Sequence, residues 1–305
     1  MHGGSGNEIG KIFNFENLNE IIKNTSLDRG EILISIVMPV YNEEKTIKAV
    51  LESLPNNETV EILVIDDHSS DKSLKEIESV SELKNLIVLK HHINKGYGSA
   101  ILTGIRKSKG EIIVTMDSDG QHQSEDIINL VEPIVRKEAD ITVGSRYVGS
   151  YNYKVPVSTR IGEAVIEMFI KVFFNRKVMN NQGGFRAFHR KTLKMFDDMK
   201  FEDYAFTTEL LLKAALLKFK IKEVPINLYN RDYGSSKIIL TKLMLHLLLC
   251  IVYYTIQWVN RPYVNKWMIK RLIFIKKLPI YGKPKIIQNV PLVDTKVIPV
   301  ADFIK

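Results

Sequence analysis

Short runs of aliphatic residues alternate with helix-length amphipathic segments between residues 32 and 143, and this alternation limits the fold more than any other feature of the chain. It is the pattern of βαβ units, in which a helix connects two parallel strands. The aliphatic runs are continuous, which is typical of strands that helices cover on both faces. We therefore expect a mostly parallel α/β sheet with strands at 32–38, 60–65, 86–90, 111–116 and 140–144.

Two of the intervening segments carry helix signals. Residues 43–54 place four aliphatic side chains on one stripe of a helix. Ser124 is followed by Glu125 and Asp126, which predicts the cap and the acidic first turn of another helix.

Composition excludes several classes of protein and of site. The 305 residues are enough for one large domain or two ordinary ones. The one cysteine, Cys250, excludes an intramolecular disulfide and a zinc site built from cysteines. Lys and Arg number 43 against 35 Asp and Glu, and the net charge of +8 suits an anionic partner. The histidines form no i,i+4 ligand pair, so we interpret His68, His91, His92, His122 and His189 as turn or surface residues.

Polar side chains follow four of the expected strands, at the point where each strand ends. They lie in the segments 39–44, 66–71, 94–98 and 117–122. Open α/β sheets bind their ligands at the carboxyl edge of the strands, so these segments are expected to meet at a ligand site. A lone Asp-x-Asp is more often a turn than a metal site, but turn chemistry alone does not explain four such segments at one edge.

The Asp117-x-Asp119 pair predicts a metal site. The two carboxylates leave an extended backbone on the same side, and Gln121 adds a carbonyl oxygen two residues later. A site with so few protein ligands suits Mg²⁺ or Mn²⁺ when a diphosphate completes the coordination. Asp67 is expected to accept hydrogen bonds from a base or ribose, and Lys95 to balance charge nearby. The chain has no Walker P-loop, which argues against a phosphate site of the NTPase type.

Six sequence blocks between about residues 32 and 240 resemble a known family. They are PVYNEE, VIDDHSSD, NKGYGSA, MDSDGQH, GSRY and QGGFRAF. In this order and spacing the chain resembles the inverting family 2 glycosyltransferases of GT-A fold, and among them the polyprenyl-phosphate sugar synthases typified by dolichol-phosphate mannose synthase. The chain departs from close relatives in having MDSDGQH where DADLQH is commoner, and in ending without several transmembrane helices.

The resemblance implies a reaction and the residues that perform it. A sugar would pass from a nucleoside-diphosphate sugar (GDP-mannose or a UDP-sugar) to a polyprenyl or dolichyl phosphate, with inversion at the anomeric carbon. The family positions that contact the nucleotide are matched by Pro39, Tyr41, Glu43, Asp67, Lys95 and Asp117. The metal positions are matched by Asp117, Asp119 and Gln121, and the basic positions that handle the phosphates by Arg146, Arg160 and Arg231, so that Asp119 and the three arginines are the expected catalytic residues.

Three other functions share parts of this pattern. A family 2 glycosyltransferase acting on a soluble or polysaccharide acceptor keeps the fold, but it leaves the apolar segment near the C-terminus without a purpose. A sugar-nucleotide pyrophosphorylase would show a glycine-rich loop with arginine after its first strand, where this chain has PVYNEE. A membrane-tethered binding module would not need the Asp-x-Asp and its arginines.

The two ends of the chain differ in character from its middle. We expect an accessory arm at 1–30, a catalytic domain at 31–237 and a membrane-associating segment at 238–305. Residues 238–259 are apolar almost throughout, and 261–285 contain eight basic residues and no acidic one. A membrane span at 238–259 would separate this basic stretch from the catalytic domain, against the positive-inside tendency.

Two arrangements avoid that separation. Residues 238–259 could close the domain as a buried helix, or attach the enzyme to one leaflet, and we expect monotopic attachment at the cytoplasmic face of the membrane. No nucleic-acid recognition module accompanies the basic stretch, so a nucleic-acid partner is not expected.

Overall fold

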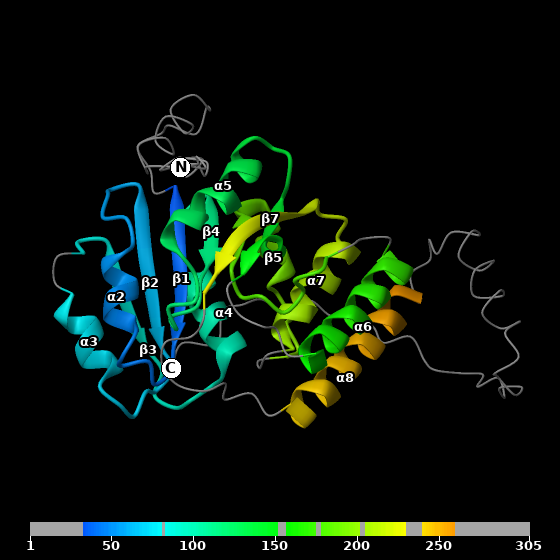
Figure 1. The fold of residues 1–305 in the computed structure, drawn as a ribbon, viewed down its shortest axis with the longest axis horizontal. Coiled ribbons are helices and arrows are strands. Elements are labelled where there is room, and N and C mark those ends of the chain that lie inside the picture. The colour runs from blue at the N-terminus through cyan, green and yellow to red at the C-terminus, as the bar shows by residue number, and fades with distance from the viewer. Residues whose placement is uncertain are drawn as a thin grey trace, which may run out of the picture. The chain divides into compact units, whose positions relative to one another are not determined.

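The structure is a computed structural model that describes residues 33–80, 83–151, 157–174, 178–201, 205–229 and 240–259. The expected arm at 1–30, Arg231 and the basic stretch 261–285 lie outside the described residues. The described chain forms a seven-stranded sheet with helices on both faces (Figure 1).

The sheet is parallel apart from one strand. Its strands are β1 (Ile34–Val40), β2 (Val60–Asp66), β3 (Leu86–Lys90), β4 (Ile112–Thr115), β5 (Ile141–Tyr151), β6 (Arg186–His189) and β7 (Ile221–Leu228). Their order across the sheet is β3-β2-β1-β4-β6-β5-β7. β6 runs antiparallel to both of its neighbours, and the other neighbouring pairs are parallel. The carboxyl ends of β1, β2, β4 and β5 therefore lie along one edge.

Helices connect these strands and cover the sheet. They are α2 (Ile47–Glu52), α3 (Ser73–Ser79), α4 (Tyr97–Lys107), α5 (Ile127–Val135), α6 (Val157–Phe174), α7 (Phe206–Leu216) and α8 (Leu240–Val259), with 3₁₀ turns η1 (Ser124–Asp126) and η2 (Arg190–Met195). The α2, α3 and α5 helices share a hydrophobic cluster on one face of the sheet, and α4 and α7 share a cluster on the other.

The central strands explain why both faces are covered. In β1, Ile36 and Met38 belong to the first cluster and Val37, between them, belongs to the second. All three side chains are fully buried, as expected for successive residues that point to opposite faces of a sheet. The mostly parallel α/β sheet predicted from the sequence is confirmed.

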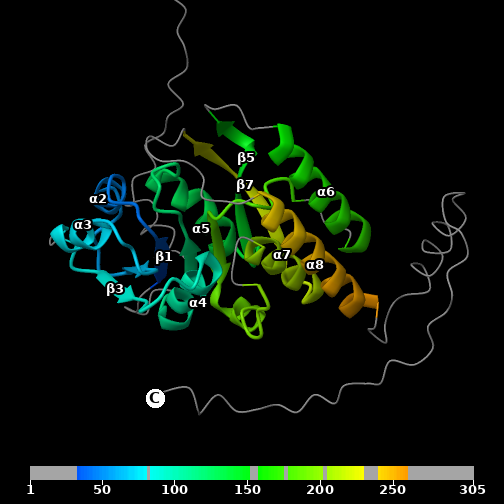
Figure 2. The same cartoon turned by 90° about the horizontal axis from the view of Figure 1, so that it is seen from below.

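A third hydrophobic cluster joins α6, α7 and α8, and these helices lie side by side in both views (Figures 1 and 2). Leu247, Cys250, Ile251 and Tyr254 of α8 are buried in it. The opposite side of α8 is exposed and apolar. No helix in the described part of the chain is both long enough and apolar enough to cross a membrane.

Two local expectations were inaccurate. Ser124 does not cap α5: it begins the η1 turn, and α5 starts at Ile127 with no side-chain cap. The strand expected at 140–144 continues to Tyr151 as β5, with a shift in its pairing with β7 between Ser145 and Ser150. Arg146 lies within this irregular part of β5, and its side chain contacts Glu163 of α6.

Candidate active site

The loops after β1 and β2 form one side of the site, and they are bound together by hydrogen bonds. Asn42 and His68 follow these strands and adopt positive φ angles of 56° and 65°. Such backbone is uncommon except for glycine, and asparagine and histidine tolerate it better than most residues. The Asn42 side chain accepts a hydrogen bond from the Ser70 N–H at 2.7 Å, and the Asn42 N–H donates to the Ser69 hydroxyl at 3.0 Å.

The first three residues expected to contact the nucleotide lie at the end of β1. Pro39 is buried, and its carbonyl oxygen accepts a hydrogen bond from the Ser118 hydroxyl at 2.9 Å. Tyr41 is exposed, and Glu43 is half-buried with its N–H donating to the Ser73 hydroxyl at 2.7 Å. The structure thus brings the β1 loop next to the Asp117–Asp119 loop.

The Asp67 carboxylate shapes the neighbouring loop. It is buried, and it accepts hydrogen bonds from the backbone N–H groups of Lys95 and Gly96 at 2.9 and 2.8 Å. His91 lies against the same carboxylate, with 2.6 Å between Nδ1 and Oδ1. The Lys95 side chain is exposed. His91 lies in the loop after β3, as one of the two alternatives for it predicted, but it is buried and is not a surface residue.

The Asp-x-Asp segment follows β4 directly. Asp119 is buried, and its Oδ1 accepts a hydrogen bond from the Gln121 N–H at 3.1 Å. The Gln121 side chain donates through Nε2 to the carbonyl oxygen of Tyr229 at 2.9 Å, which leaves Oε1 as its acceptor atom. Asp117 is partly exposed and accepts a hydrogen bond from the Tyr97 hydroxyl at 3.1 Å.

These donors suit a hard divalent cation. Two carboxylates and one amide oxygen are oxygen ligands of the kind that Mg²⁺ and Mn²⁺ take, with positions left for a ligand's phosphates. Within the described residues, no three His, Cys, Asp or Glu side chains gather to hold a metal by themselves. The space between Gly184 and Asp117 is small, because a Cβ on Gly184 would lie 2.6 and 2.8 Å from the Asp117 carboxylate oxygens.

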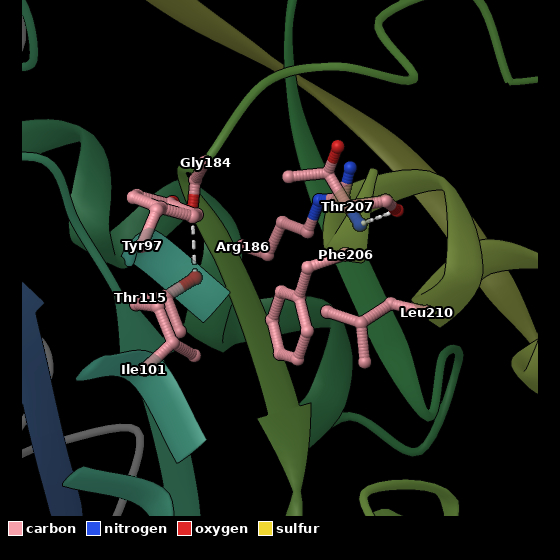
Figure 3. Close-up of a pocket in the computed structure, with 8 residues that line it drawn as sticks. All are labelled: Tyr97, Ile101, Thr115, Gly184, Arg186, Phe206, Thr207 and Leu210. Atoms are coloured by element: carbon pink, nitrogen blue, oxygen red, sulfur yellow. Dashed lines mark hydrogen bonds between the residues drawn. The ribbon is translucent and has the colours of Figure 1, made fainter. Parts of the chain in front are cut away.

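Arg186 fixes the loop 181–184, in which Gly184 lies close to Asp117. It is fully buried and donates to the carbonyl oxygens of Asn181, Gly183 and Thr207 at 2.8 to 2.9 Å. Figure 3 shows its side chain between Gly184 and Thr207, in a small pocket that Tyr97 also lines. Burial lowers the pKa of the guanidinium to about 10, so it stays charged at neutral pH.

A second cluster lies where β5 meets α6. Arg146 of β5 is nine-tenths buried and donates to the Glu163 carboxylate of α6 at 2.6 Å. The Tyr147 hydroxyl donates to the other oxygen of that carboxylate. Arg160 lies over the Tyr147 ring, 4.6 Å from its centroid, and is partly exposed. The structure thus places two of the three predicted arginines together.

Sequence reasoning missed the acids of this cluster, and it missed the buried position of His122. Glu163 and Glu167 occur in an amphipathic helix, where charged side chains are usually solvent-facing. His122 is buried against Phe185, with ring centroids 4.7 Å apart, and its Nδ1 has no hydrogen-bond partner among the described residues. Its interpretation as a turn or surface residue was therefore wrong.

Residues 35–196 match the model of glycosyl transferase family 2, which is more than half of the chain. The chain belongs to that family. It is 33% identical over 223 residues to a UDP-N-acetylglucosamine–dolichyl-phosphate N-acetylglucosaminyltransferase of Methanococcus voltae, an alignment that covers 67% of this chain and 89% of the relative. It is also 28% identical over 212 residues to an undecaprenyl-phosphate mannosyltransferase of Micrococcus luteus, covering 66% of this chain and 85% of that one.

Solved structures confirm the GT-A-like fold of this glycosyltransferase. Glucosyl-3-phosphoglycerate synthase of Mycobacterium tuberculosis, solved with Mn²⁺, UDP and glucosyl-3-phosphoglycerate, superposes with a TM-score of 0.60. The alignment covers 83% of this chain and 86% of that protein at 18% identity. The same protein was also solved with Mg²⁺ and UDP.

Proposed function

We propose that this family 2 glycosyltransferase moves a sugar from a nucleoside-diphosphate sugar to a polyprenyl phosphate, with a divalent cation and with inversion. The observation that carries the proposal is a pair of sites: oxygen donors for a cation at the end of β4, and two arginines where β5 meets α6, a helix that also carries exposed apolar side chains. Two of its relatives are named for dolichyl-phosphate and undecaprenyl-phosphate acceptors, and a UDP-sugar is the first donor to test.

The donor would bind over the loops that follow β1, β2 and β4. Tyr41, Glu43 and Lys95 are accessible there, and Asp67 holds the Lys95 backbone in position. Asp117, Asp119 and Gln121 would hold the cation beside the diphosphate. A bound Mg²⁺ or Mn²⁺ supplies positive charge against the charge that develops on the leaving nucleoside diphosphate.

The acceptor needs no general base. A phosphate monoester is already ionised near neutral pH, because its second pKa is about 6, so its oxygen can attack the anomeric carbon directly. What it needs is positive charge that orients it, and Arg160 supplies an accessible guanidinium. Attack from the side opposite the leaving diphosphate inverts the anomeric carbon. Arg231 is assigned to the acceptor phosphate on the sequence pattern alone.

Membrane attachment is part of the proposal, because a polyprenyl phosphate stays in the leaflet. Two helices carry exposed apolar stripes: Val165, Met168 and Val172 on α6, and Leu245, Leu248, Leu249, Val252 and Ile256 on α8. Arg160 is on the same helix as the first stripe, and a lipid bound there would be held close to the membrane surface that these stripes are proposed to contact. We place the enzyme at the cytoplasmic face as a peripheral or monotopic protein, with the basic residues 261–285 attracting anionic lipid.

A soluble acceptor is the second candidate. The support for it is the fold shared with a protein solved with glucosyl-3-phosphoglycerate, whose acceptor part is also a phosphate monoester. Exposed apolar stripes on α6 and α8 would have no use in such an enzyme, which favours the lipid.

An acceptor panel separates the two candidates. The purified full chain is incubated with Mn²⁺ or Mg²⁺, with UDP-N-acetylglucosamine, UDP-glucose or GDP-mannose, and with either a short-chain polyprenyl phosphate or 3-phosphoglycerate. We expect a glycolipid product whose anomeric configuration is opposite to that of the donor. Transfer to 3-phosphoglycerate alone would refute the lipid acceptor, and a product with retained configuration would refute the mechanism.

A further inference from the structure

Two glutamates one turn apart on α6 differ sharply in their surroundings. Glu163 is fully buried, with 1% of its side chain exposed, whereas Glu167 is 17% exposed. Both contact Arg160: its Nη2 donates to Glu167 at 3.4 Å, and its Nη1 lies 4.0 Å from Glu163. The Arg160 guanidinium is therefore shared by a buried carboxylate and a partly exposed one.

Glu163 is the fixed point of this cluster. One carboxylate oxygen accepts a hydrogen bond from Arg146, and the other accepts one from the Tyr147 hydroxyl. Its backbone carbonyl accepts a hydrogen bond from the Asn181 side chain at 2.9 Å, which ties α6 to the loop that passes Asp117. A buried carboxylate with this many donors keeps its geometry, because each donor would be left unpaired if it moved.

Glu167 makes a weaker contact with Arg160. The Arg160 side chain is 40% exposed, and the 3.4 Å distance to Glu167 is long for a charged hydrogen bond. Arg160 Nη1 is buried and has no hydrogen-bond acceptor among the described residues. An anion would therefore reach Arg160 through the exposed part of its side chain, and the acidic side chain nearest to that part among the described residues is Glu167.

We propose that Glu163 and Glu167 set the affinity for the anionic acceptor with opposite signs. Glu163 is a positioning residue that fixes Arg146, Tyr147 and thereby Arg160, and Glu167 occupies Arg160 until a phosphate displaces it. This inference rests on the proposed function, since it assigns the acceptor phosphate to Arg160. The same Glu-to-Gln substitution at these two positions of α6 should therefore change the acceptor affinity in opposite directions.

The test compares Glu163→Gln with Glu167→Gln in full-length protein. For Glu163→Gln we expect the acceptor KM to rise about tenfold or more, because the buried Arg146 loses its counter-ion. For Glu167→Gln we expect the acceptor KM to fall about two- to fivefold, because an exposed pair is worth little and its loss frees Arg160. The donor KM should change in neither variant. Glu132→Gln removes a comparable Glu–Arg pair with Arg136 on α5 and serves as the control.

The outcomes separate this inference from the function on which it rests. A wild-type protein that transfers nothing to polyprenyl phosphate refutes the proposed function and the inference with it. If wild type is active and both variants shift the acceptor KM in the same direction, or neither does, only the inference is refuted. If Glu163→Gln does not fold, Tyr147→Phe replaces it. That variant keeps the ring under Arg160 and removes one donor to Glu163, and an unchanged acceptor KM in it would overturn the positioning role.

Discussion

Buried charged side chains hold the loops that form the site. Asp67 binds two backbone N–H groups, Arg186 binds three backbone carbonyl oxygens, and Glu209 binds the N–H groups of Lys200 and Phe201. Hydrogen bonds to charged groups contribute about 1.5–3 kcal/mol each, roughly twice a neutral one. Loops fixed in this way can present their remaining atoms to a ligand without large loss of entropy on binding.

Asp119→Asn tests the proposed metal site by replacing one carboxylate oxygen with an amide nitrogen. Asparagine keeps an oxygen for the Gln121 N–H and nearly the same volume, so the fold should survive. Losing the negative charge should reduce transfer to background, because a hard cation prefers carboxylate oxygens. Activity and thermal unfolding are measured side by side. Full activity of the variant in chelator-treated buffer restored with Mg²⁺ would show that the cation binds elsewhere.

Gly184→Ala tests the contact between the loop 181–184 and Asp117. The new Cβ would lie 2.4 Å from the Tyr97 hydroxyl and 2.6 Å from Asp117 Oδ1, so both side chains must move. Because these are side-chain ends, we expect a modest loss of stability, about 1–2 kcal/mol, and a much larger loss of kcat. The control is Gly183→Ala, whose Cβ would have atoms of the Asn180 side chain as its three nearest neighbours. Equal loss of kcat in the two variants would contradict the role of Gly184.

At the scale of helices and strands, the structure shows which elements sequence reasoning can find. The interior parallel strands were predicted to within a few residues, because each is a continuous aliphatic run. β7 was missed because it alternates buried and exposed residues and contains Pro225, which argues against a strand. β6 was missed because it is four residues long and lies inside the QGGFRAF block.

Which site residues could be predicted depends on the elements that carry them. Those at the ends of parallel strands were found because such strands share one edge, whatever their side chains do. The Glu163 and Arg186 contacts were not found, because they depend on a contact between α6 and β5 and on the antiparallel insertion of β6. Neither feature leaves a periodic pattern in the sequence.

Tyr254→Phe tests the attachment of α8 to α7. The Tyr254 hydroxyl donates to the buried Glu209 carboxylate at 2.5 Å, and burial raises the pKa of the phenol, so it remains a donor. Removing it leaves a buried carboxylate short of one donor, and we expect unfolding free energy to fall by about 1–3 kcal/mol. Denaturant unfolding measures this. Tyr253→Phe, an exposed neighbour on the same helix, should change it little, and a similar loss there would contradict the assignment.

His189 makes the η2 turn sensitive to pH. Its Nδ1 accepts the Lys191 N–H at 3.1 Å, and burial lowers its pKa from the usual 6.5. The unfolded chain therefore takes up the proton first as pH falls, so the contribution to stability is complete above 6.5 and is lost between 6.5 and the folded value. His189→Asn keeps an acceptor and does not titrate. We expect the unfolding free energy of wild type to fall more than that of this variant from about pH 8 to pH 5. Parallel curves of unfolding free energy against pH would contradict this role of His189.

At the scale of the whole molecule, one edge of the sheet carries both the proposed donor site and the proposed acceptor site. The oxygen donors follow β4, and the arginine cluster lies where β5 meets α6. The loop 181–184 joins the two: Gly184 lies close to Asp117, and the Asn181 side chain donates to a backbone carbonyl oxygen of α6. A displacement reaction needs such an arrangement, because the attacking and leaving groups must approach the sugar from opposite sides. The two helices that carry the exposed apolar stripes, α6 and α8, lie side by side (Figures 1 and 2).

Membrane binding by this enzyme should have an apolar part and an electrostatic part that can be separated. Leu245 and Leu248 are more than half exposed on α8, and replacing both with Gln should weaken binding to vesicles at least about tenfold, since a buried leucine contributes about 1.5–3 kcal/mol. Ile93→Gln, at a somewhat more exposed aliphatic residue after β3, is the control and should change nothing.

Salt then separates the two contributions, because it screens charges but not apolar contacts. Wild type should bind vesicles containing anionic lipid more weakly as salt rises, through the basic residues 261–285, and deletion of 261–305 should remove most of that salt dependence. The double leucine variant should keep the wild-type salt dependence at a lower overall affinity. Vesicle sedimentation over a salt series measures both slopes. If the leucine variant loses its salt dependence and the deletion keeps it, the roles of α8 and of the basic stretch are the reverse of those proposed.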